Sequence, residues 1–138
     1  MSEGNRKVVV VPCSGIGKAY GTVAREAAYE LCDELRPGTT QLVALSKLVL
    51  GEAGAQERVR QSPAVAIDGC KLRCAAALVE LCGGTLVREV AVLDAFKQHR
   101  ELKPEGIAEL NAEGKQLARL VAESIAAFLD ELGRCDHA

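Results

Sequence analysis

The sequence predicts an α/β fold, with a mostly parallel sheet of about four strands covered by helices on both faces. Two observations lead to this class. Short apolar runs alternate with longer segments of helical periodicity, and turns rich in glycine or proline separate them. Ala, Val and Leu supply most of the apolar residues, while aromatic residues make up 3% of the chain. Because such alternation forms βαβ units, the strands are expected to run parallel.

Four segments have the short apolar pattern of buried strands. The first, over residues 7–11, reads Lys-Val-Val-Val-Val. An uninterrupted β-branched run of this kind is typical of a central strand in a parallel sheet. The third follows Pro63 and reads Ala-Val-Ala-Ile. The strands are therefore expected over residues 7–11, 40–45, 64–67 and 85–93.

Helices are expected between these strands. Residues 18–35 carry apolar side chains at three- and four-residue spacing, and a Pro-Gly pair at 37–38 ends the pattern. The segment after the second strand holds Gly51 and Gly54 and is expected to be a loop or a short helix. A further helix is expected over residues 70–81, closed by two glycines.

A long amphipathic helix is expected near the C-terminal end of the chain. It follows Pro104 and is capped by Gly133, and Gly114 is expected to break or kink it. Its apolar stripe consists of Ile107, Leu110, Leu117, Val121, Ile125, Phe128 and Leu132. Together the strands and helices predict a three-layer, Rossmann-like sandwich.

Charge and apolar patterning exclude several classes of function. Lys and Arg total 17 against 19 Asp and Glu, and this net charge of −2 indicates no basic surface for nucleic acid. The longest apolar runs, such as residues 8–12, are too short to span a bilayer, and the polar residues 1–7 do not form a signal peptide. We therefore expect a cytoplasmic protein without membrane or nucleic-acid partners. It should form one α/β domain over residues 1–138, with flexible tails at 1–6 and 134–138.

A glycine-rich loop joins the first expected strand to the first expected helix. Gly15, Gly17 and Gly21 give the pattern Gly-x-Gly-x-x-x-Gly, and backbone N–H groups at a helix N-terminus suit an anion. The spacing does not fit a Walker loop or a dinucleotide fingerprint. Two interpretations remain. One is a site for a small anionic ligand at Ser14, Gly15, Gly17 and Lys18, and the other is a tight turn that lets the helix approach the sheet.

Six cysteines are the unusual feature of the composition. Cys70 and Cys74 are four residues apart at the start of an expected helix, so their sulfur atoms should share one helix face, where the N-terminus favours thiolates. Cys13 follows the first strand, and ligands bind at the carboxyl ends of strands in such sheets. We expect the three thiols to meet in one crevice, as metal ligands or as attacking and resolving thiols. Unrelated packing of small side chains is the alternative.

Asp68 also has two interpretations. It can cap the following helix by accepting a backbone N–H near Lys71. It can also supply a carboxylate ligand or a proton acceptor beside Cys70, and the two roles are compatible. Cys32 and Cys82 are far from the strand ends and are expected to be small core residues.

Two segments carry a family resemblance. Residues 9–31 read Val-Val-Val-Pro-Cys-Ser-Gly-Ile-Gly-Lys-Ala-Tyr-Gly-Thr-Val-Ala-Arg-Glu-Ala-Ala-Tyr-Glu-Leu. Residues 66–75 read Ala-Ile-Asp-Gly-Cys-Lys-Leu-Arg-Cys-Ala. Both resemble segments of the DGC-domain proteins, which are small prokaryotic proteins named after an Asp-Gly-Cys motif and described as candidate zinc-binding proteins. The resemblance extends over residues 8–93. It implies a zinc site of four cysteines, three of which correspond to Cys13, Cys70 and Cys74.

The fourth cysteine implied by the resemblance has no counterpart in this chain. Its place, at the end of the second strand, corresponds to Ala44. Because structural zinc is nearly always four-coordinate, the fourth position would fall to Asp68, to water, to a tail residue such as Cys135 or His137, or to nothing. An open position is found in catalytic and transfer sites, and also in sites that have lost their function.

The leading hypothesis is a small zinc-binding protein with thiolate ligands, because soft thiolates favour Zn²⁺ or Cu⁺ over hard cations. The alternative is a thiol-based enzyme or redox protein that uses Cys70 and Cys74, or Cys13, together with the glycine loop. A third hypothesis is an interaction module in which the long C-terminal helix docks on a second chain.

Overall fold

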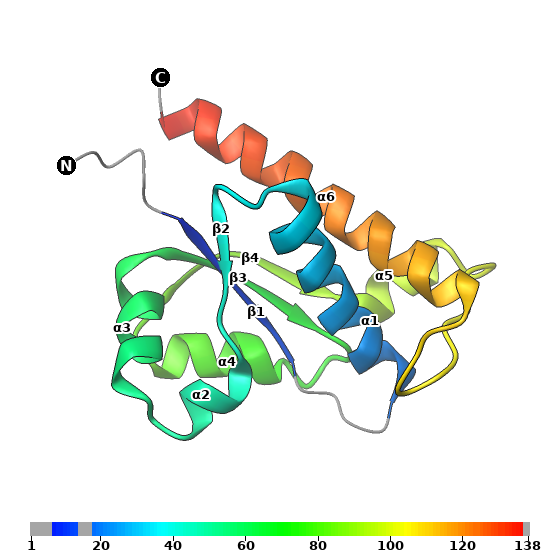
Figure 1. The fold of residues 1–138 in the computed structure, drawn as a ribbon, viewed down its shortest axis with the longest axis horizontal. Coiled ribbons are helices and arrows are strands. Elements are labelled where there is room, and N and C mark those ends of the chain that lie inside the picture. The colour runs from blue at the N-terminus through cyan, green and yellow to red at the C-terminus, as the bar shows by residue number, and fades with distance from the viewer. Residues whose placement is uncertain (1–6, 14–17, 137–138) are drawn as a thin grey trace.

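A four-stranded parallel sheet lies at the centre of the fold, as the sequence predicts. The computed structural model describes residues 7–13 and 18–136 (Figure 1). The strand order is β2-β1-β3-β4, so β1 and β3 are central and the other two strands are edges. The strands are β1 (Val8–Pro12), β2 (Thr40–Leu42), β3 (Pro63–Asp68) and β4 (Thr85–Ala91).

The helices form two layers around this sheet. Figure 1 shows α2, α3 and α4 on one face and α1, α5 and α6 on the other. A π-helical stretch, η2, directly follows α1. The helix expected over residues 18–35 is therefore confirmed, as an α-helix that continues into a π-helix. The helices are α1 (Ala19–Tyr29), η2 (Glu30–Leu35), α2 (Leu45–Val49), α3 (Ala53–Gln61), α4 (Cys74–Leu81), α5 (Val92–Gln98) and α6 (Ala112–Asp136).

Burial follows the predicted pattern in β1, where Val9, Val10 and Val11 are fully buried. The second strand is shorter than expected, because β2 ends at Leu42 and α2 begins only three residues later. Ladder pairing with β1 ends where the chain turns into α2, whose first residue, Leu45, is buried in the core. A buried apolar residue such as Leu45 can begin a short helix as well as extend a strand. The sequence therefore could not distinguish a longer strand from the start of α2.

The long C-terminal helix begins at Ala112, so the expectation that it starts after Pro104 is wrong. The side chain of Asn111 sets this start, because its Oδ1 atom accepts the backbone N–H of Gly114 at 2.9 Å. Gly114 therefore lies in the first turn and does not break the helix. Upstream, Gly106 has a φ of +99°, a conformation outside the helical region.

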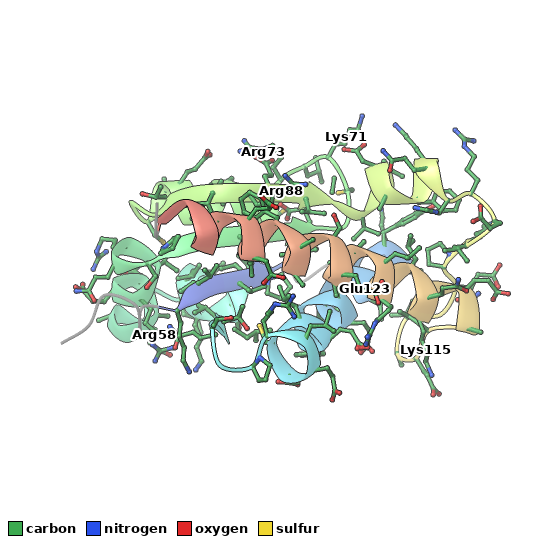
Figure 2. All side chains as sticks on the ribbon, turned by 90° about the horizontal axis from the view of Figure 1, so that it is seen from above. Arg58, Lys71, Arg73, Arg88, Lys115 and Glu123 are labelled. Carbon is green, nitrogen blue, oxygen red and sulfur yellow. The ribbon has the colours of Figure 1, made fainter. Side chains whose placement is uncertain are left out.

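Helix α6 packs on its own chain. It contacts α1 and η2, and the Arg88 guanidinium of β4 lies 4.8 Å from the centre of the Phe128 ring. Lys115 and Glu123 lie on its exposed face (Figure 2). The helix also continues past Gly133 to Asp136, so the expected glycine cap is wrong. Among the described residues, no helix is both long enough and apolar enough to cross a membrane.

Candidate functional site

The strand order reverses direction at the carboxyl ends of β1 and β3. The chain passes from β1 to β2 at one edge and then crosses back to β3 on the other side of β1. Open α/β sheets bind their ligands at such a reversal. Cys13 directly follows β1, and Asp68 is the last residue of β3. Sequence reasoning placed these residues at strand ends, and the topology makes the two ends neighbours.

Cys13 joins the two strand ends through hydrogen bonds. Its backbone N–H donates to the carbonyl oxygen of Ile67 at 2.9 Å. Its Sγ atom accepts the backbone N–H of Gly69 at 3.2 Å. The residue is 6% exposed, so its thiol lies below the surface with a fixed backbone donor.

Gly69 occupies a position with no room for a side chain. A Cβ atom there would lie 2.8 Å from the backbone nitrogen of Gly21 and 2.9 Å from the carbonyl carbon of Tyr20. Both neighbours belong to the backbone of the first turn of α1, so neither can move aside as a flexible side chain could. The glycine of the Asp-Gly-Cys motif thus lets β3 approach the start of α1.

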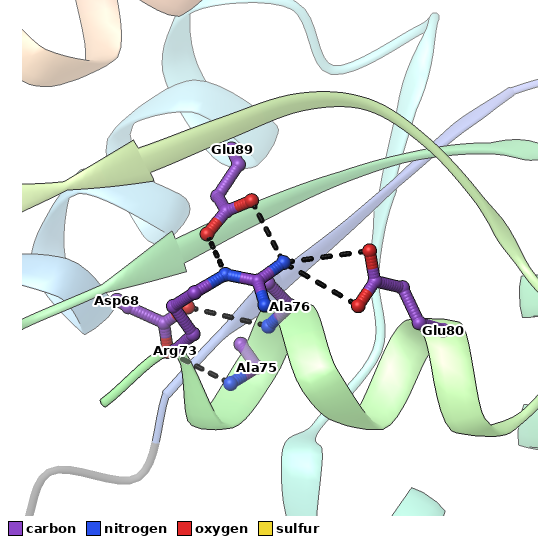
Figure 3. Close-up of polar contacts among 6 residues, drawn as sticks. All are labelled: Asp68, Arg73, Ala75, Ala76, Glu80 and Glu89. Atoms are coloured by element: carbon purple, nitrogen blue, oxygen red, sulfur yellow. Dashed lines mark hydrogen bonds and ion pairs between the residues drawn. The ribbon is translucent and has the colours of Figure 1, made fainter. Parts of the chain in front are cut away.

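Asp68 caps helix α4 from within the core (Figure 3). Its Oδ1 atom accepts the backbone N–H of Ala75 at 2.7 Å, and its Oδ2 atom accepts that of Ala76 at 3.2 Å. The expected capping role is present, with these two residues as donors in place of Lys71. Burial raises the pKa of the Asp68 carboxyl above its ordinary value, and the two hydrogen bonds oppose that rise.

Helix α4 begins at Cys74, so the expectation of a helix from residue 70 is wrong. The cause is the Asp68 cap, which sets the first helical turn at Ala75 and its neighbours. Residues 69–73 form a turn, and Arg73 at its end is left-handed, with a φ of +59°. Cys70 therefore lies in the turn and Cys74 on the helix, and the two thiols do not share one helix face.

Arg73 is anchored by two carboxylates that sequence reasoning missed. Its Nε and Nη2 atoms donate to the carboxylate of Glu89 on β4, the latter at 3.0 Å (Figure 3). Its Nη2 atom also lies 3.4 Å from both carboxylate oxygens of Glu80. Hydrogen bonding to Arg73 lowers the pKa of Glu89. Glu89 is 16 residues away in sequence, so no local spacing indicates the pair.

The three predicted thiols lie in one neighbourhood with unequal exposure. Cys13 is buried, Cys70 is half-buried and Cys74 is exposed. Burial is the main cause that raises the pKa of Cys13, and the Gly69 hydrogen bond opposes it. The charges of Asp68, Cys74 and Cys70 raise that pKa further. Across residues 7–13 and 18–136, however, no three His, Cys, Asp or Glu side chains are already arranged to hold a metal ion.

The other expected positions lie partly outside this neighbourhood. Cys32 and Cys82 are half-buried and pack against the hydrophobic core, as expected. Lys18 is exposed and lies directly before α1 with an extended backbone. Ala44 lies directly before α2 and is also extended. Four of the expected site residues, Ser14, Gly15, Gly17 and His137, lie outside the described residues. The side chain of a fifth, Cys135, is not described either.

Comparison with known proteins identifies the family. The DGC domain matches residues 9–123, which is most of the chain and includes every residue of the neighbourhood around Cys13. The chain therefore belongs to the DGC-domain family, as its motifs indicate. No curated protein and no solved structure matches it.

Proposed function

We propose that this protein binds a thiophilic metal ion, Zn²⁺, through Cys13, Cys70 and Cys74. The observation that supports the proposal is geometric: Cys13 follows β1 at the strand-order reversal, and its Sγ atom accepts the N–H of Gly69, the residue before Cys70. Cys74 begins helix α4, which directly follows that turn. Free thiols suit a reducing compartment such as the cytoplasm, and the five cysteines up to Cys82 are free.

The chemistry of the donor set fits such an ion. Thiolate sulfur is a soft ligand, which favours Zn²⁺ or Cu⁺ over Mg²⁺ or Ca²⁺. Both carboxylate oxygens of Asp68 already accept backbone N–H groups of α4, so we assign Asp68 to holding that helix and the thiolates to holding the metal. Three protein ligands leave one position for water or another small ligand, and a bound zinc would act there as a Lewis acid.

Metal binding in this scheme requires the thiols to close around the ion. Cys13 is fixed by Gly69 and Ile67, whereas Cys70 lies in a turn and Cys74 is exposed at the first position of α4. We therefore assign the movement to the side chains of Cys70 and Cys74. Each thiol must also lose its proton to bind the metal, so metal affinity should increase with pH.

Cobalt substitution of the reduced protein tests the proposal. Thiolate ligation to Co²⁺ produces a sulfur-to-metal charge-transfer absorption whose intensity increases with the number of thiolates. The wild-type chain should show this absorption, and Zn²⁺ should abolish it. Cys13→Ser, Cys70→Ser and Cys74→Ser should each reduce it, while Cys32→Ser, which changes a core cysteine, should not. Equal spectra for the wild type and all three site variants would contradict the proposal.

Thiol chemistry is the second candidate, and the exposure of Cys74 at the start of α4 favours it. Burial raises the pKa of Cys13 and so disfavours that residue as the nucleophile. Iodoacetamide labelling at pH 6 distinguishes the two candidates in metal-free protein. A thiol enzyme should have one cysteine that reacts much faster than a cysteine in an unstructured peptide. Uniformly slow labelling would reject this candidate.

A further inference from the structure

Arg73 ends the turn at residues 69–73 with the one left-handed backbone found among the non-glycine residues that the structure describes. Its φ of +59° is unfavourable for a residue with a Cβ atom, and residues held in such conformations are concentrated at functional sites. Cys70 lies inside this turn, and Cys74, the next residue, is the first of α4. The turn that Arg73 ends therefore joins two of the proposed metal ligands.

The side chain of Arg73 attaches the end of this turn to a strand and to a helix. Its Nε and Nη2 atoms donate to the two carboxylate oxygens of Glu89 on β4, and Nη2 also lies 3.4 Å from the carboxylate oxygens of Glu80 on α4 (Figure 3). The side chains of Arg73 and Glu89 are 44% and 36% exposed, so water and dissolved ions reach the pair. Such a pair can hold the turn and can also open.

The other end of the turn is held by buried contacts. Gly69 donates its backbone N–H to the Sγ atom of Cys13 and lies against the backbone of the first turn of α1. Between the two ends, Lys71 lies 3.9 Å from the carboxylate of Asp94 on α5, and both side chains are exposed, so this contact is weak. Opening of the ion pair at Arg73 would therefore free the turn from β4 and leave its first residue in place.

From these features we infer that the Arg73–Glu89 ion pair controls the release of the metal ion from the proposed thiolate site. This inference rests on the proposed function. Arg73 is a positioning residue in it, because its side chain acts through Cys70 and Cys74 and is not itself a ligand. While the pair is closed, the turn has less conformational freedom to lose when its thiolates bind the ion. When the pair opens, Cys70 can move away from Cys13, and the ion leaves faster.

Release kinetics of the full chain test this inference, with Co²⁺ as the probe. Loaded protein mixed with excess EDTA loses its sulfur-to-metal charge-transfer absorption at a rate that measures release. Arg73→Gln and Glu89→Gln should each release Co²⁺ about threefold to tenfold faster than the wild type, because one partly exposed, doubly hydrogen-bonded ion pair is lost. At saturating Co²⁺, both variants should absorb as strongly as the wild type, because all three thiolate ligands remain.

Ionic strength provides a readout that a general loss of stability would not change. Dissolved ions screen an exposed ion pair, so an increase in sodium perchlorate from about 0.05 M to about 0.5 M should speed release from the wild type. The same increase should have a smaller effect on Glu89→Gln, which has no pair to screen. An equal salt response in the two proteins would overturn the inference.

Arg119→Gln is the matched control. Arg119 also pairs with one carboxylate on its own helix, Glu123, and with one on a distant segment, Glu30, and its side chain is 46% exposed. It belongs to α6, on the opposite face of the sheet from α4, so its loss should leave release unchanged (Figure 1). Equal release rates in the wild type, Arg73→Gln and Glu89→Gln would overturn this inference alone. Absence of the charge-transfer absorption in the wild type would overturn the proposed function and this inference with it.

Discussion

The Sγ atom of Cys13 accepts the backbone N–H of Gly69 at 3.2 Å, and this contact joins the two sequence motifs of the chain. One motif follows β1 and the other follows β3, which are adjacent central strands. The contact explains why residues 56 positions apart form one neighbourhood. It also makes the backbone at Gly69 part of the site, although glycine contributes no side chain.

Replacement of Gly69 by alanine should destabilise the fold. The added Cβ atom would meet the backbone of Tyr20 and Gly21 below 3 Å, so β3 or α1 must shift. We expect a loss of about 1–3 kcal/mol in the free energy of unfolding, as for other overpacked sites. Urea unfolding measures the loss. Gly38→Ala is the matched control, because a Cβ atom there has nothing within 4 Å, and equal losses in the two variants would refute this explanation.

Removal of the Asp68 carboxylate should loosen the start of α4. In Asp68→Ala the N–H groups of Ala75 and Ala76 lose their acceptors, which should lower stability by about 1–3 kcal/mol. Asp68→Asn keeps one acceptor oxygen and turns an NH₂ group toward the other donor. Its stability should therefore lie between that of the wild type and that of Asp68→Ala. Hydrogen exchange at both amides measures the effect directly. Unchanged exchange in Asp68→Ala would show that the cap does not hold the helix. Asp33→Ala, which changes an exposed aspartate, is the control and should leave exchange at both amides unchanged.

The Arg73–Glu89 pair should make stability depend on acidic pH. Hydrogen bonding to Arg73 lowers the folded-state pKa of Glu89 below its ordinary value of 4.5. The pair therefore stabilises the fold above about pH 4.5, and this contribution is lost as the pH falls through the lower, folded-state pKa. Both side chains are partly exposed, so the effect should be small.

Thermal unfolding between pH 7 and pH 3 checks this dependence. The acid-side fall in Tm should be smaller in Glu89→Gln than in the wild type, since the variant has no charge to lose. Glu34→Gln, at an exposed position of η2, should retain the wild-type slope. A Glu89→Gln profile parallel to that of the wild type would mean that the pair is not formed in solution.

The architecture could be predicted from the sequence because local patterns determine it. The β-branched run of β1 and the periodicity of α1 each reflect burial of one surface, and both elements are observed. Two of the errors lie at helix starts, where a side chain from outside the helix sets the first turn. Asp68 does so for α4 and Asn111 for α6, and neither changes the apolar periodicity of the segment that follows it.

The candidate site could be predicted only in part. Its cysteines are conspicuous in the sequence, and their position after parallel strands indicates a common edge. The turn at residues 69–73 could not be predicted, because Arg73 ends it with a left-handed backbone and its side chain pairs with Glu89, a distant residue on β4.

The zinc content of the chain tests the central claim most directly. Protein purified under anaerobic conditions without an affinity tag should contain about one zinc per chain by elemental analysis. Cys70→Ser, purified in the same way, should have lost it, and Cys32→Ser should retain it. Metal-free wild-type protein with fully titratable thiols, or equal zinc in Cys70→Ser, would contradict the assignment of Cys13, Cys70 and Cys74 as the metal ligands.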